Sequence, residues 1–264
     1  MDPSTVSAWF FFLMLSQLAP AGSPQAALYP VQLPPIVAVE TPAEPVEPID
    51  RVQGSVELSF VSTTGNTATQ TVGTAAGLRF RPGMWVIDAE GRYLRTTADD
   101  ELRAESVSSG VRAARNLFDE VAAYAETRHQ RNTFTGIRRQ LTAEFGISKD
   151  FLKKETQQLS AEVAIGHIDE DRLSGDDRRL TSGTAGAKLR FALSKTSTWT
   201  QNARLVTDLG NTSDWRLQHE AALAASLNAV LSLKLAHSVS YVREPVPGFG
   251  RTDAVGSAAL VASF

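Results

Sequence analysis

Apolar and polar side chains alternate with a period of two from Gln53 to the end of the chain. In the first run, Val56, Leu58 and Phe60 alternate with polar neighbours, and the pattern resumes after a turn at Gly65-Asn66. A period of two is typical of β-strands whose two faces meet different environments. A third run opens at Trp85, and later runs predict strands near residues 102–114, 121–131, 136–147, 157–168, 181–191, 198–209, 214–225, 229–242 and 252–264. The sequence therefore predicts an all-β domain of about twelve strands.

The connections between these runs alternate in length. Every second connection is a tight turn, such as Arg81-Pro82-Gly83 or Ser226-Leu227-Asn228. The others include longer segments at residues 169–179 and 243–251. An even strand number with alternating short turns and long loops is typical of a single antiparallel transmembrane β-barrel, with both termini on the periplasmic side.

The last strand places Ala254, Gly256, Ala258, Leu260, Ala262 and Phe264 on one face, and the chain stops on the aromatic residue. A terminal strand of this kind is typical of bacterial outer-membrane barrels, in which the final strand pairs with the first and leaves no open edge. We expect Leu260 and Phe264 to act as the signal for the barrel assembly machinery. The expected surroundings are outer-membrane lipid and lipopolysaccharide.

The first 51 residues differ in composition from the rest of the chain. A short apolar run from Ala8 to Leu18, followed by small residues, predicts a signal peptide over residues 1–27, although no Lys or Arg precedes Arg51. Six prolines between residues 28 and 51 predict an extended periplasmic tether. Docking of a periplasmic partner on Ile36–Val39 is the alternative for this segment. The barrel is then expected over residues 52–264.

Charge and composition narrow the function classes. Five of the 29 acidic residues precede Arg51, so 24 acidic residues accompany 26 basic ones in the remainder. A near-neutral domain without a basic cluster argues against nucleic-acid binding. The chain has no cysteine, which excludes thiolate metal sites and a Cys nucleophile. We expect no cofactor and no resident metal.

Charged residues of both signs fall on the polar face of several strands. The candidates for a barrel lumen are Arg128, Arg138, Glu144, Glu162, Arg216, Glu220 and Lys234. Charge pairs across the narrow interior of a twelve-stranded barrel would restrict or close it. A small channel and a closed structural barrel both remain open.

Two other functions remain as alternatives. His129 and His167, with Glu126, Asp169 or Asp171 close in sequence, would form the rim site of an outer-membrane hydrolase. A soluble periplasmic ligand-binding barrel would show the same alternation with the apolar face turned inward. The acidic residues between 169 and 177 are interpreted as a solvated outer loop rather than a calcium site, because they lack the order of a calcium-binding loop.

Three segments resemble a family of salt-induced outer-membrane proteins whose domain has no known function. They are residues 54–60, the turn Thr64-Gly65-Asn66-Thr67, and the stretch from Glu244-Pro245-Val246-Pro247-Gly248-Phe249 to Phe264. The resemblance implies an outer-membrane barrel without an established activity, linked to salt or osmotic stress. Ala262 departs from the family pattern, in which Tyr is common near the end of the last strand.

Overall fold

Twelve strands follow one another in the computed structural model, which describes residues 52–63, 69–98 and 101–264. The first six are β1 (Val52–Thr63), β2 (Thr69–Phe80), β3 (Trp85–Ala98), β4 (Glu101–Phe118), β5 (Val121–Asn132) and β6 (Ile137–Lys153). The last six are β7 (Gln157–Arg172), β8 (Arg178–Ala192), β9 (Ser197–Asp208), β10 (Trp215–Ser226), β11 (Leu231–Val242) and β12 (Thr252–Ser263). The predicted signal peptide and tether lie outside the described residues.

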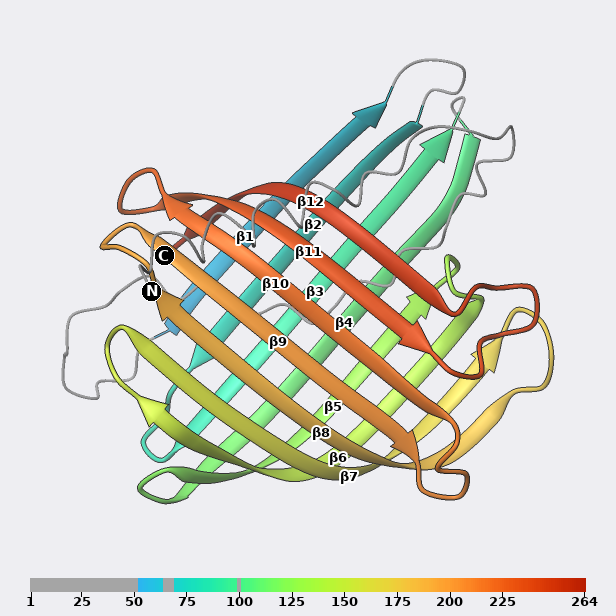
Figure 1. Cartoon of the computed structure of the whole chain (residues 1–264), viewed down its shortest axis with the longest axis horizontal. Coiled ribbons are helices and arrows are strands. Elements are labelled where there is room, and N and C mark those ends of the chain that lie inside the picture. The colour runs from blue at the N-terminus through green and yellow to red at the C-terminus, as the bar shows by residue number, and fades with distance from the viewer. Residues whose placement is uncertain (1–51, 64–68, 99–100) are drawn as a thin grey trace, which may run out of the picture.

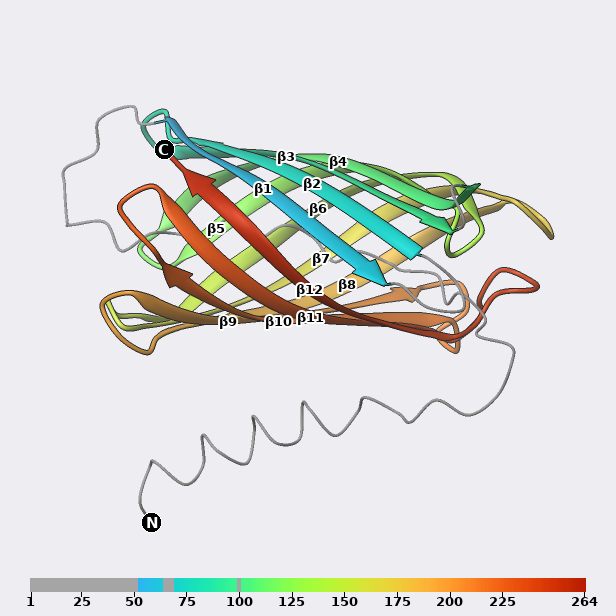
Figure 2. The same ribbon diagram turned by 90° about the horizontal axis from the view of Figure 1, so that it is seen from above.

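Each strand pairs antiparallel with its neighbours in sequence, and β12 pairs with β1 to close the barrel (Figure 1). The closing register places Val56 opposite Ala262 and Leu58 opposite Leu260. The view from above shows the strands forming the wall of the barrel, with β1 and β12 side by side near the C-terminus and diverging toward their other ends (Figure 2). The predictions of about twelve strands and of pairing between the last strand and the first are confirmed. The closing pairs join Ser55–Ser59 of β1 to Ala259–Ser263 of β12, and over that stretch they remove the sheet edges that would otherwise template aggregation.

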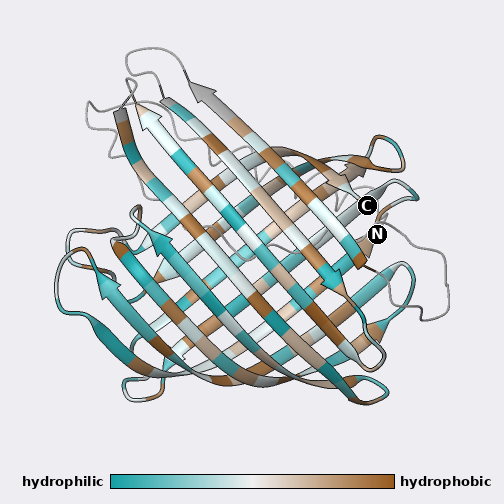
Figure 3. Cartoon of the chain, turned by 180° about the vertical axis from the view of Figure 1, so that it is seen from behind, coloured by the Kyte–Doolittle hydropathy of each residue, from teal (hydrophilic) through white to brown (hydrophobic). Residues whose placement is uncertain are grey.

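The two faces of the wall have opposite character. Large apolar side chains point outward, and Phe60, Phe145 and Ile165 are each exposed over more than half of their surface. Glu144, Glu162 and other polar side chains are buried inside. The alternation along each strand is visible as bands of two colours in Figure 3. A water-soluble barrel has the reverse arrangement, so the orientation that the sequence pattern left open is apolar outward and polar inward.

The segment at residues 169–179 differs from the prediction. It is not a long solvated loop, because β7 continues to Arg172 and β8 begins at Arg178. In the ladder, Asp169 lies opposite Arg179 and Glu170 lies opposite Arg178. Arg179 Nε lies 3.2 Å from Asp169 Oδ1, and this cross-strand ion pair stabilises the extended hairpin. By contrast, residues 243–251 form a loop between β11 and β12, as predicted.

The barrel has two distinct ends. The strand starting at Val52 and the strand ending at Ser263 meet at one end, which we call the terminal end. The other end, which we call the loop end, carries the connections β5–β6, β7–β8, β9–β10 and β11–β12. Within the described ranges, no helix has the length and apolar character needed to cross a bilayer.

Candidate functional site

Most of the predicted lumen residues lie on the inner face of the wall. Those whose side chains are largely buried inside are Arg128, Glu144, Glu162, Arg216, Glu220 and Lys234. Arg138 is exposed instead, at a β-bulge between Ile137 and Arg139. The bulge inserts one extra residue into β6 and interrupts the alternation of faces there. Arg204 and Arg112, which the sequence did not single out, join the interior set.

Arg204 on β9 is the centre of the interior network. Its Nη2 atom donates a hydrogen bond to Oε2 of Glu144 on β6 over 2.6 Å. Its Nη1 atom lies 3.7 Å from Oε1 of Glu162 on β7. The hydroxyl of Thr184 on β8 donates a further bond to Glu144 Oε2 at 3.4 Å. One guanidinium thus connects strands that are not neighbours in the barrel.

Arg112 on β4 continues this network toward the other side of the wall. Its Nη1 atom lies 3.0 Å from Oε2 of Glu162 and 3.3 Å from Oε2 of Glu126. Glu126 also pairs with Arg128 on the same strand. The Arg112 guanidinium carbon stands 3.5 Å from the ring centroid of Tyr124, a cation–π arrangement. We call the set Arg112, Glu126, Arg128, Glu144, Glu162 and Arg204 the central charge layer.

The side chains of the central charge layer are packed together and have little contact with solvent. The exposed fractions of the Glu144, Glu162 and Arg204 side chains are 2%, 8% and 9%. Side chains that lined a wide aqueous lumen would keep much more of their surface accessible to water. The charges therefore neutralise one another inside a constriction, which is how buried ions are tolerated.

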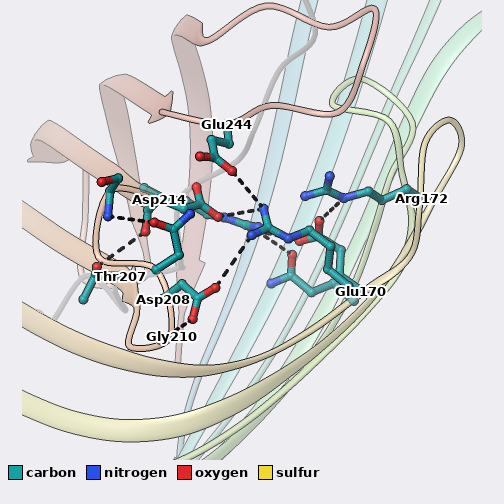
Figure 4. Close-up of polar contacts among 12 residues, drawn as sticks. Glu170, Arg172, Thr207, Asp208, Gly210, Asp214 and Glu244 are labelled. Atoms are coloured by element: carbon teal, nitrogen blue, oxygen red, sulfur yellow. Dashed lines mark hydrogen bonds and ion pairs between the residues drawn. The ribbon is translucent and has the colours of Figure 1, made fainter.

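A second set of ion pairs lies closer to the loop end. Glu170, which is fully buried, accepts hydrogen bonds of 2.6 Å from Arg172 and from Arg216. Arg178 Nη1 lies 2.7 Å from Asp214 and 3.8 Å from Glu244. Asp208 at the end of β9, Asp214 in the β9–β10 connection and Glu244 in the β11–β12 loop place their carboxylates around Arg178, beside the pair formed by Glu170 and Arg172 (Figure 4). We call these residues the mouth cluster.

The β11–β12 loop, residues 243–251, reaches across the loop end, and we call it the lid. A Cβ atom on Gly136, in the β5–β6 turn, would lie 2.5 Å from the Phe249 ring and 2.9 Å from Val246. Ser174 Oγ, in the β7–β8 turn, donates a 2.6 Å hydrogen bond to the Pro247 carbonyl. The β5–β6 pair lies opposite the β11–β12 pair in the strand order. The lid therefore covers the mouth of the barrel.

A separate inner ion pair lies on the β10–β1 side of the wall. Lys234 Nζ lies 3.2 Å from Glu57 Oε2 and 3.8 Å from Glu220 Oε1. Both Lys234 and Glu220 have side chains only 4% exposed. Charges of opposite sign are thus paired around much of the interior.

A small polar cavity lies between the central charge layer and Arg216, with a volume of about 40 Å³. Its wall includes three glutamine side chains, from Gln130, Gln140 and Gln218, together with Arg128 and Ser182. A space of this size accommodates roughly three water molecules. The interior thus consists of paired charges with a small hydrophilic pocket beside them.

The residues considered for a hydrolase site lie on both faces of the wall. The two carboxylates that share the outer face with His167, those of Asp169 and Asp171, pair with arginines. His129 and His167 are exposed on the outer face. His129 lies opposite the outward Leu141 in the ladder, and His167 follows the outward Ile165 by two residues on β7. Glu126 points inward, so the wall separates it from His129. In the part of the chain that the structure describes, no three histidine or acidic side chains are placed to hold a metal ion.

Comparisons with known proteins agree with this architecture. The barrel is similar to the NanC porin, with a TM-score of 0.50 at 12% identity over 79% of this chain and 98% of that one. It is also similar to the COG4313 outer membrane channel from Pseudomonas putida F1, with a TM-score of 0.50 at 8% identity over 87% and 100%. At these identities the likeness concerns the fold alone.

One curated protein matches the sequence, and it is itself uncharacterised. The uncharacterized protein YdiY of Escherichia coli K12 is 20% identical over 207 residues, which cover 78% of this chain and 79% of YdiY. A family model described as "Protein of unknown function, DUF481" matches residues 56–264. The family resemblance seen in the sequence is confirmed, and the chain belongs to the DUF481 family.

Proposed function

We propose that this protein is an outer-membrane β-barrel that acts as a narrow channel for small ions and solutes, held largely closed from within. The observation that carries the proposal is the low exposure of Glu144, Glu162 and Arg204, which fill the interior as paired charges. A packed layer of this kind leaves little space for permeation at rest. Rearrangement of its ion pairs would widen the path.

The outward apolar face supports a membrane location. Phe60, Phe145 and Ile165 present apolar surface to the surroundings over more than half of their area. A soluble protein rarely exposes apolar surface over a whole closed wall. In an outer membrane the same surface would contact lipid, while the polar face lines the lumen. Export by residues 1–27, tethering by residues 28–51 and assembly through Leu260 and Phe264 belong to this proposal, as does lipopolysaccharide around the wall.

The chemistry of the interior favours a channel over a purely structural barrel. Well-packed apolar residues stabilise a protein interior at least as well as buried ion pairs do. The interior instead has charged groups, glutamines and a small polar cavity. Polar side chains of this kind provide hydration sites for a permeating ion that an apolar filling lacks.

The mouth cluster gives a physical route to the proposed link with salt stress. Glu244, in the lid, is about half exposed and lies 3.8 Å from Arg178. Attraction between exposed charges weakens as ionic strength rises, because the Debye length falls from about 10 Å at 0.1 M to about 3 Å at 1 M. High salt would therefore loosen the lid.

Single-channel recording in planar bilayers tests the proposal. We expect rare, small openings from the purified, refolded protein. Complete absence of openings across a range of voltages contradicts the channel. Outer-membrane fractionation and heat-dependent gel mobility test the location separately, and recovery of the folded protein in the soluble periplasmic fraction contradicts it.

A further inference from the structure

We propose that the cavity beside the central charge layer binds a small oxyanion that also carries a hydroxyl group, of which hydrogen phosphate is the simplest example. The inference rests on the side chains that line this cavity and on the polar atoms among them that have no partner within the protein.

The wall of the cavity carries several guanidinium groups, each already paired with a carboxylate: Arg128 with Glu126, Arg204 with Glu144, and Arg216 with Glu170. Arg128, Arg204 and Arg216 line it together with a single carboxylate, that of Glu144. A guanidinium group has five N–H donors, so a pair with one carboxylate leaves others available, and their planar arrangement suits the geometry of oxyanions. The three glutamine amides in the wall add neutral donors and acceptors.

Three atoms of the lining residues are buried without a hydrogen-bond partner in the protein. They are Arg128 Nε, Ser182 Oγ and Glu144 Oε1. Ser182 is fully buried, and the Glu144 side chain is 2% exposed. A buried polar group without a hydrogen bond destabilises the folded protein. A ligand that satisfied these atoms would remove that destabilisation.

A ligand that satisfies all three atoms must both accept and donate hydrogen bonds. Arg128 Nε is a donor and therefore needs an acceptor oxygen, which an oxyanion supplies. Ser182 Oγ can either donate or accept. Glu144 Oε1 is a carboxylate oxygen, which repels an oxyanion lacking a proton but accepts a hydrogen bond from a P–OH group. Hydrogen phosphate supplies both kinds of contact, whereas sulfate has no hydroxyl at neutral pH.

The cavity is large enough for such a ligand. Its volume of about 40 Å³ corresponds to roughly three water molecules. A tetrahedral oxyanion occupies a comparable space once those waters leave. The role of the site as an anion filter rests on the proposed channel, but its occupancy does not.

Equilibrium dialysis of the full chain, refolded in detergent, against radiolabelled phosphate or sulfate at matched ionic strength tests the proposal. We expect phosphate to bind with a Kd at least tenfold below that of sulfate. Ser182→Ala should weaken phosphate binding about fivefold. Glu144→Gln, which supplies an amide donor in place of the free carboxylate oxygen, should abolish the preference for phosphate. The matched control is Gln53→Leu, on the inner face of β1 at the terminal end, which should bind as the unaltered protein does.

Equal binding of the two anions, no binding of either, or a Ser182→Ala variant that binds phosphate unchanged overturns the site. If Glu144→Gln fails to fold for want of the Arg204 partner, Ser182→Ala and the comparison of anions in the unaltered protein still decide. The channel is judged by conductance alone. If phosphate binds but no openings occur, the channel is refuted and the anion site stands. If openings occur but phosphate does not bind in preference to sulfate, the anion site is refuted and the channel stands.

Discussion

Gly54 of β1 and Phe264, which follows β12, pair by two backbone hydrogen bonds where the first and last strands meet. The Gly54 amide donates to the Phe264 carbonyl over 2.7 Å, and the Phe264 amide donates to the Gly54 carbonyl over 2.9 Å. A Cβ atom on Gly54 would lie 2.5 Å from the Phe264 ring. The terminal aromatic thus covers a position where only glycine leaves room, which links the C-terminal residue to closure of the sheet.

Replacing Gly54 by Val should impair closure, because the new side chain would collide with the Phe264 ring. We expect a lower yield of the folded, heat-modifiable form on gels after refolding into detergent. Gly256→Val is the control, since a Cβ at Gly256, on the outer face of β12, meets nothing within 4 Å. Equal folding yields for the two variants would show that the ring contact is unimportant for closure.

Replacing Val163 by Arg should destabilise the barrel in a bilayer. Val163 is 54% exposed on the outer face of β7, between Ile147 and Ala185 in the ladder. A lipid-facing arginine near the midplane of the bilayer costs about 2–4 kcal/mol. Urea unfolding of the protein in phospholipid vesicles measures this cost. Thr156→Arg, in the β6–β7 turn, is the control, and an equal effect at both positions would argue against a lipid-facing wall.

Replacing Gly136 by Val should displace the lid. Gly136 has a φ of 77°, and any Cβ there would press on Phe249 and Val246. We expect faster trypsin cleavage after Arg243 and Arg251, the exposed arginines of the lid, detected by mass spectrometry of the fragments. Gly91→Val, on the open outer face of β3, should leave the rate unchanged. A lid that stays protected in Gly136→Val would mean that its packing on the β5–β6 turn does not hold it.

Removing the charge of Glu244 should loosen the lid in the same way that high salt does. The pair between Arg178 and Glu244 is partly exposed, so screening weakens it. We expect the conductance, divided by bulk conductivity, to rise between 0.1 M and 1 M KCl in the unaltered protein. Glu244→Gln should show the raised ratio already at 0.1 M. Glu155→Gln, in a turn at the terminal end, serves as the control. A ratio independent of salt in all three proteins would show that the Arg178–Glu244 pair does not hold the lid.

The period-two pattern was sufficient to predict the fold. Twelve strands, closure between the last and the first, and most strand boundaries follow from local alternation and turn residues, which act over a few positions of the chain. The inner location of Glu144 and Glu162 follows from the same parity. Arg138 escapes the pattern because a β-bulge shifts it.

The contacts of the interior could not be predicted in the same way. Arg204 reaches Glu144 and Glu162 across the curved wall, and that proximity depends on barrel closure and on the stagger of several strands. Burial of Glu170 depends on Arg216 from β10. The lid gave one signal, since Val246 and Phe249 are apolar residues in a polar loop, but nothing in the sequence indicates that they pack on Gly136.

Conductance of a barrel without its central ion pair tests the closed channel most directly. In the double variant Glu144→Ala/Arg204→Ala, both charges of the pair and their bulk are removed together, and Glu162, which loses Arg204, keeps Arg112 at 3.0 Å. We predict at least a threefold rise in single-channel conductance in planar bilayers. The control is Arg139→Gln/Asp171→Asn, which removes an ion pair of 2.9 Å on the outer face. A conductance in the interior variant equal to that of the control and of the unaltered protein would contradict the account.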